Sequence, residues 1–108
     1  MIKQISVEKV DHAETCKISH FSQIPDDDSK QPFNLIHLVV NPLCNTERDQ
    51  HRVKECWFIL QGKGLLTTDD IHTTQVEKGQ LFFFESMMAH QLYNSSSDSD
   101  LEVLSIWW

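Results

Sequence analysis

Apolar and polar positions alternate along most of this chain in short runs, and turn-forming residues separate the runs. Apolar residues at every second position place one face of a β-strand against a core. Eight or nine such runs and no convincing helix predict an all-β sandwich or barrel. The candidate strands occupy residues 5–9, 16–21, 33–40, 56–60, 65–68, 71–77, 81–84, 89–94 and 101–108.

Turn residues mark the boundaries between these runs. Asn41 and Pro42 end the run at 33–40, and two glycines follow the run at 56–60. The acidic segment PDDDSKQP, residues 25–32, reads as an exposed loop. The segment ERDQHRVKE, residues 47–55, is ambiguous because its i, i+4 charge pattern also suits a helical turn.

Composition narrows the class of protein and its partners. A chain of 108 residues is one domain's worth, which predicts a single domain over 1–108. A net charge of −7 excludes a basic stripe for nucleic acid and disfavours an acidic membrane surface. Three cysteines form no C-x-x-C pair, so neither a disulfide framework nor a structural zinc site is expected. Without a signal-like segment or a run of about 18 apolar residues, we expect a cytoplasmic protein.

His51 and Glu55 pose a geometric problem, because two ligands of one metal ion have donor atoms about 3–4 Å apart. On a straight strand, residues four positions apart are about 13 Å apart. A turn through residues 52–54 would solve this, with His51 ending one strand and Glu55 starting the next. The alternation then puts Trp57 and Ile59 on the face of Glu55. A carboxylate among apolar side chains needs a partner.

His90 is the candidate partner for Glu55. It lies in a strand-like run with Met88 and Leu92 on its face. An antiparallel neighbour could lay His90 directly opposite Glu55.

The two segments that contain these residues resemble the cupin superfamily of small β-barrels. The first cupin motif has two histidines spaced H-x-H, then three or four residues, a glutamate, six further residues and a glycine. DQHRVKECWFILQG, residues 49–62, matches it at His51, Glu55 and Gly62. Asp49 stands where the first histidine would be.

The second cupin motif resembles GQLFFFESMMAHQLYN, residues 79–94. Gly79, His90 and Asn94 match in identity and spacing. Glu85 stands in the position of the family's proline and Met87 in that of its glycine. Together the motifs imply a single cupin jelly-roll barrel, in which Asn94 is structural.

The resemblance also implies one divalent metal ion, since cupins commonly hold it with these histidines and the glutamate. The candidate ligands are therefore His51, Glu55 and His90. Asp49 leaves three outcomes open: it ligates as an oxygen donor, it turns away, or the barrel holds no metal. Two histidines with one carboxylate suit iron, manganese, nickel or zinc.

A small barrel interior is both core and pocket. We expect Trp57, Ile59, Met88 and Leu92 to line the pocket, because they share faces with the candidate ligands. His37, on the run at 33–40, is a further candidate for the cavity.

Two functions follow from the resemblance. The first is a metal-dependent enzyme, an isomerase or a dioxygenase, acting on a small organic metabolite. Arg48, Arg52 and Lys54 could attract an anionic substrate to it. The alternative is a non-catalytic ligand-binding or sensor cupin, with or without metal. The apolar chain end at 106–108 predicts a homodimer.

Overall fold

The computed structural model describes residues 2–22 and 33–108, so the predicted loop at 25–32 lies outside the described residues. Within them the chain forms strands and no helix, which confirms the all-β prediction. No helix long and apolar enough to cross a membrane occurs in this part of the chain. The nine strands are β1 (Val7–His12), β2 (Cys16–Phe21), β3 (Asn34–Val40), β4 (Glu55–Gln61), β5 (Lys63–Thr68), β6 (His72–Glu77), β7 (Leu81–Phe84), β8 (His90–Asn94) and β9 (Leu101–Trp107).

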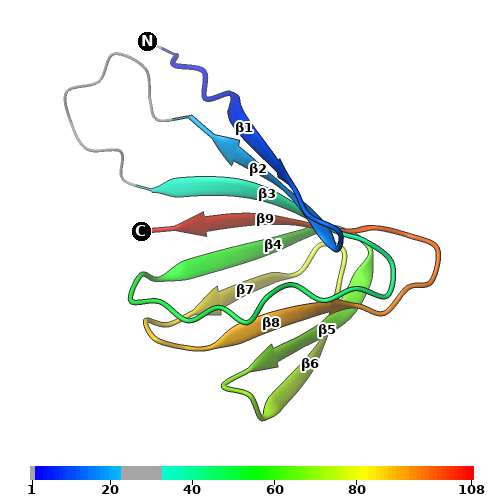
Figure 1. Cartoon of the computed structure of the whole chain (residues 1–108). Coiled ribbons are helices and arrows are strands. Elements are labelled where there is room, and N and C mark those ends of the chain that lie inside the picture. The colour runs from blue at the N-terminus through cyan, green and yellow to red at the C-terminus, as the bar shows by residue number, and fades with distance from the viewer. Residues whose placement is uncertain (1, 23–32) are drawn as a thin grey trace.

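The strands build two antiparallel sheets. The larger has the order β1-β2-β3-β9-β4-β7 and the smaller the order β6-β5-β8. Figure 1 shows the C-terminal strand β9 between β3 and β4, in the middle of the larger sheet. Residues near the start of the chain thus share a sheet with its last strand.

The core lies between the two sheets. Inward residues of β4, β8 and β9 alternate with more exposed ones, as the period of two predicts. Fully buried Val40, Ile59 and Val103 from the larger sheet pack with Leu66 and Leu92 from the smaller one. This packing fixes which face of β4 and β8 points inward.

The segment at 47–55 is extended and bent. Asp49 forms a single antiparallel bridge with His90, residues 52 and 53 form a bend, and Glu55 begins β4. The helical alternative is therefore wrong, and the predicted turn between His51 and Glu55 is present. His51 itself ends no strand, because pairing between β3 and His51 is limited to isolated bridges at Asn45 and Asp49.

Gly62 joins β4 to β5 with a φ of +90°. A Cβ atom there would lie 2.6 Å from the carbonyl oxygen of Asp100. The first motif's glycine is therefore required both by its backbone conformation and by the close approach of the chain before β9.

Candidate metal centre

Glu55 and His90 begin strands that belong to different sheets. Glu55 pairs with Phe84 and with Trp107 in the larger sheet, while His90 pairs with Thr68 in the smaller one. The prediction that His90 lies opposite Glu55 on a neighbouring strand is therefore wrong. The two side chains meet across the interior because both residues are buried on the inward faces of facing sheets.

Donor atoms meet here in two overlapping sets, because His51 and His90 approach both Glu55 and Asp49. Nε2 of His51 lies 2.9 Å from Oε1 of Glu55, and Nε2 of His90 lies 3.3 Å from the same oxygen. Oδ2 of Asp49 lies 3.7 Å from Nε2 of His51. One ligand atom from each of Asp49, His51 and His90 lies within 4.8 Å of the other two, so this cluster could hold a metal ion. Such separations suit donors that share an ion at about 2.0–2.2 Å.

The Glu55 carboxylate is oriented by two donors on one of its oxygens. The indole Nε1 of Trp57 donates to Oε2 at 2.5 Å, and the Ser105 hydroxyl donates to the same atom. Among the described residues, no aligned donor reaches the buried Oε1, which faces the two histidines. Without an ion, the charge of His90 compensates this oxygen only in part, because a buried carboxylate oxygen without an aligned hydrogen bond is costly. A cation between Oε1 and the imidazole nitrogens would satisfy it, so the donor set fits a metal ion.

Burial and neighbouring groups shift the pKa values of Glu55 and His90 in opposite directions. Burial raises the pKa of Glu55, but His90, Ser105 and Trp57 outweigh it and hold the pKa below its ordinary 4.5. Burial lowers the pKa of His90, but Glu55 and the Met88 carbonyl outweigh it and hold the pKa above 6.5. Without an ion the two side chains form a charge pair, and an ion would displace the His90 proton.

Backbone hydrogen bonds hold the donors in place. The N–H of Asp49 donates to the His90 carbonyl and the N–H of His90 to the Asp49 carbonyl, both at 2.9 Å. Nδ1 of His90 lies 3.0 Å from the Met88 carbonyl oxygen, which assigns Nδ1 as the donor and leaves Nε2 facing Glu55. The N–H of Met87 donates to the His51 carbonyl at 2.7 Å.

Met87 explains one departure from the second cupin motif. Its φ is +67°, so the left-handed conformation that suits the family's glycine is kept by a methionine. A non-glycine residue in this region costs about 1–2 kcal/mol per residue. The hydrogen bond to His51 depends on this turn and helps offset that cost.

A cavity of about 360 Å³ adjoins the cluster. Trp57 lines it as expected, but the prediction is wrong for Ile59, Met88 and Leu92, which are not part of the lining. Ile59 and Leu92 are fully buried in the core, and Met88 packs against that core. The prediction for His37 is wrong: Ile36 and Leu38 point into the cavity, so His37 between them faces the other side, where its ring lies 3.0 Å from Glu102.

Sequence reasoning missed the part of the cavity lining that β2 and β3 contribute. Cys16 and Ile18 of β2 lie there with Ile36 and Leu38 of β3. These strands carry no motif, and both faces of β3 are rich in apolar residues, so alternation alone could not assign the inward one. Cys16, like Cys44 and Cys56, is a free thiol, as expected.

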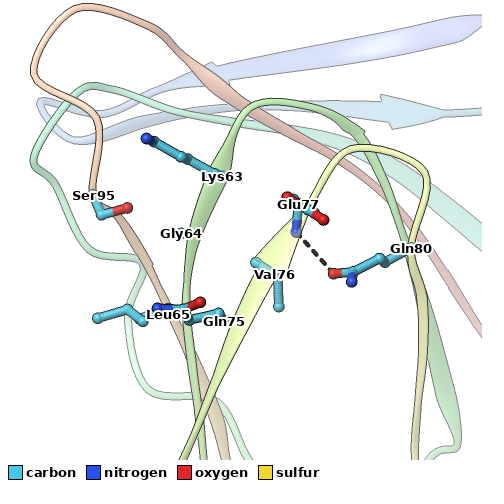
Figure 2. A pocket seen from close by; sticks show the side chains of 8 residues that line it. All are labelled: Lys63, Gly64, Leu65, Gln75, Val76, Glu77, Gln80 and Ser95. Atoms are coloured by element: carbon cyan, nitrogen blue, oxygen red, sulfur yellow. Dashed lines mark hydrogen bonds between the residues drawn. The ribbon is translucent and has the colours of Figure 1, made fainter.

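A second cavity of about 490 Å³ lies at the other end of the smaller sheet, where β5 and β6 approach Ser95 (Figure 2). Its lining includes Lys63, Gln75 and Glu77, which are exposed. The backbone N–H of Glu77 donates to the side chain of Gln80 at 2.8 Å. Asp49, His51, Glu55 and His90 are not part of this lining.

Asn94 has the structural role that the second motif implies. Its amide nitrogen donates to the carbonyls of Val40 and Ser99, and its side-chain oxygen accepts from the N–H of Ser96. It is fully buried at the end of β8 away from His90. Asn94 thus ties β8 to the chain before β9.

A family model described as the cupin domain matches residues 36–107 of the chain, which include both motifs. This protein is a cupin. The match begins in β3 and runs to the last residue of β9, so it contains Asp49, His51, Glu55 and His90.

Solved structures agree with this assignment at the level of the fold. A cupin 2 conserved barrel domain protein from Salinispora arenicola is 19% identical, with a TM-score of 0.78 over 93% of this chain and 81% of its own. The plu4264 protein from Photorhabdus luminescens is 21% identical, with a TM-score of 0.76 over 100% and 87%. A predicted oxalate decarboxylase from Thermotoga maritima is 16% identical, with a TM-score of 0.69 over 99% and 97%.

Proposed function

We propose that this cupin binds one divalent metal ion through His51, His90, Glu55 and Asp49, and uses it to bind or transform a small organic molecule. The observation that carries the proposal is the Oε1 atom of Glu55. It is buried, lacks an aligned hydrogen-bond donor among the described residues, and lies within 3.3 Å of two imidazole nitrogens.

Two imidazoles and two carboxylates suit iron, manganese, nickel or zinc. A bound ion would supply Lewis-acid or redox chemistry to a ligand in the adjoining cavity. Trp57 and Ser105 hold the Glu55 carboxylate, and the Met88 carbonyl fixes the His90 ring. The apolar wall of β2 and β3 keeps water from one side of the cavity.

Isomerase or dioxygenase chemistry is the catalytic form of this proposal. A non-catalytic, ligand-binding cupin is the second candidate, and one observation favours it. Of the described residues that line the cavity, Glu47 is the one carboxylate outside the proposed ligand set, and it is exposed. General acid–base catalysis therefore has few groups available beyond the ligands themselves.

Metal content tests the proposal directly. Protein purified without an affinity tag and incubated with Fe²⁺, Mn²⁺, Ni²⁺ or Zn²⁺ should retain about one ion per chain by elemental analysis. His51→Ala and His90→Ala should each abolish retention, while His37→Ala, a histidine on the outer face, should leave it unchanged. A wild-type chain that retains none of these ions, or full retention in both variants, contradicts the proposal.

Turnover separates the two candidates. The metal-loaded protein is screened against small metabolites, with oxygen consumption and product formation as readouts. Turnover that is lost in His90→Ala supports an enzyme. Saturable binding of the same compounds without turnover supports the ligand-binding alternative.

We further propose that a second copy of the chain covers the outer face of the larger sheet. Phe58, Leu81, Phe83 and Trp108 are between 38% and 65% exposed. The rings of Phe83 and Trp108 are 6.4 Å apart and form one apolar surface. Light scattering at micromolar concentration should give a dimer, and Phe83→Lys should give a monomer. A monomeric wild-type protein contradicts this part.

A further inference from the structure

The charges around the 360 Å³ cavity restrict what it can bind. Its lining contains three carboxylates, those of Glu47, Asp49 and Glu55. Of the described residues in that lining, Arg48 is the one with a permanent positive charge. Arg52 and Lys54, which the sequence suggested as attractants for an anion, are not part of it. The cavity wall is therefore acidic.

Arg48 is already paired with a residue outside the cavity. Its Nε lies 2.6 Å from Oδ1 of Asp70 and its Nη2 lies 2.9 Å from Oδ2, which is a bidentate arrangement. Both terminal nitrogens also lie 3.4 Å from Oε1 of Gln50. The pair is exposed, so its contribution to stability is small. Its consequence is that a ligand carboxylate must compete with Asp70 for the guanidinium fork.

A divalent ion would not make the electrostatic potential in the cavity positive. The carboxylates of Asp49 and Glu55 cancel its two charges, and imidazole ligands are neutral. Glu47 remains negative at the rim. An anionic ligand would thus enter a site with no surplus positive charge, and it would face a carboxylate.

The part of the lining contributed by β2 and β3 is apolar. Cys16, Ile18, Ile36 and Leu38 line the cavity from strands of the sheet that also carries Trp57. A ligand with an apolar body gains from contact with these side chains, because its surface is removed from water. A small anion with charge at both ends has no such surface to offer.

We infer that the cavity takes a small uncharged molecule, with an apolar body and one neutral oxygen or nitrogen donor directed at the ligand cluster, and that it discriminates against carboxylates. The inference deepens the proposed function and rests on it for the donor's position. It also separates this chain from a protein that acts on oxalate, which is a doubly charged carboxylate without an apolar part.

Benzamide, benzoate and oxalate are suitable probes, because the first two share one ring and differ in charge. Binding is followed through the visible absorption of protein loaded with Co²⁺, after elemental analysis has established one ion per chain. Benzamide should bind roughly tenfold or more tightly than benzoate, and oxalate most weakly. Tighter binding of benzoate or oxalate, or binding of neither ring compound, overturns the inference.

A substitution in the Arg48–Asp70 pair gives the most direct test of the charge selectivity. Asp70→Asn frees the guanidinium, so benzoate affinity should rise several-fold while benzamide affinity stays unchanged. The matched control Arg48→Gln with Asp70→Asn removes both charges and should leave benzoate binding weak. If Asp70→Asn leaves benzoate affinity unchanged, Arg48 does not set the selectivity and the inference fails.

Failure of the proposed function has a different signature. If the wild-type chain retains no metal, the same probes are titrated against tryptophan fluorescence, since Trp57 lines the cavity. The order of benzamide over benzoate should then persist, because the site lacks the ion and is more acidic. A reversed order under these conditions contradicts the charge argument itself.

Discussion

The cavities of about 490 and 360 Å³ lie at opposite ends of the β5–β8 ladder and differ in how exposed their charged lining residues are. The larger, of about 490 Å³, is bordered by exposed charges such as Lys63 and Glu77, which water already solvates. The smaller, of about 360 Å³, contains Glu55 and His90, which are 6% and 3% exposed. Burying ionisable groups costs free energy unless a partner compensates. The burial and convergence of polar groups therefore indicate a site more reliably than volume does.

The largest difference is expected when one glutamate charge is removed at each cavity and the metal affinity is compared. Glu55→Gln should lower metal affinity by at least about 100-fold, because a carboxylate ligand becomes a neutral amide. Glu77→Gln makes the same chemical change at the larger cavity and should leave affinity unchanged. Isothermal titration with Mn²⁺ or Zn²⁺ measures both. Equal losses in the two variants would erase the distinction between the cavities.

Acidification should weaken metal binding by about tenfold per pH unit below the raised pKa of His90, because the ion must displace one proton. Titrations between about pH 5 and pH 8 test this. A binding constant that does not change over this range would show that His90 is no ligand.

Metal-free protein should show the opposite pH trend in stability over part of that range. The charge on Glu55 stabilises the fold above its unfolded pKa of 4.5, and this contribution is lost as the pH falls through the lowered folded value. The charge on His90 stabilises the fold below 6.5, and this contribution is lost as the pH rises through the raised value. Urea unfolding in the presence of a chelator should therefore give its greatest stability between pH 4.5 and 6.5.

A smaller effect is expected from the residue that holds the Glu55 carboxylate. Ser105→Ala should lower metal affinity by about 10-fold to 100-fold, since a partner that orients a ligand is lost. Ser95→Ala, at the larger cavity, is the matched control and should have no effect. Thermal unfolding of the metal-free variants separates loss of affinity from loss of fold. Unchanged affinity in Ser105→Ala would leave Trp57 as the sole orienting group.

The smallest change in overall affinity is expected at Asp49. Asp49→His restores the residue that the first cupin motif has at this position, and it should shift preference from Mn²⁺ towards Ni²⁺ and Zn²⁺ by several-fold. Competition between ions, read by elemental analysis, measures this ratio. An unchanged ratio would mean that the side chain of Asp49 turns away from the ion.

The sequence predicted the strands and singled out His51, Glu55 and His90 as candidate ligands, because alternation and motif spacing are local properties. It misassigned His37, since the apolar run 33–40 offers two similar faces and only pairing with β2 and β9 decides between them. It also placed His90 beside Glu55 in one sheet, whereas strand order depends on long-range pairing that no local pattern encodes.

Ser105 illustrates the limit most clearly. It lies 50 residues from Glu55 in an alternating strand of no distinctive composition, yet its hydroxyl reaches the carboxylate. Nothing in LEVLSIWW marks this serine as different from those of the polar loop before it. The pairing of β4 with β9, which sets Trp57 opposite Ser105, brings it to the site. That register could be found only by building the sheet.

The reciprocal backbone bridge between Asp49 and His90 also bears on the choice of metal. It fixes where two donors stand without involving either side chain. The position of a donor is thereby separated from its identity. In the proposed centre, a single substitution at residue 49 would therefore exchange an oxygen donor for a nitrogen donor, and so alter the metal preference, while the scaffold stays intact.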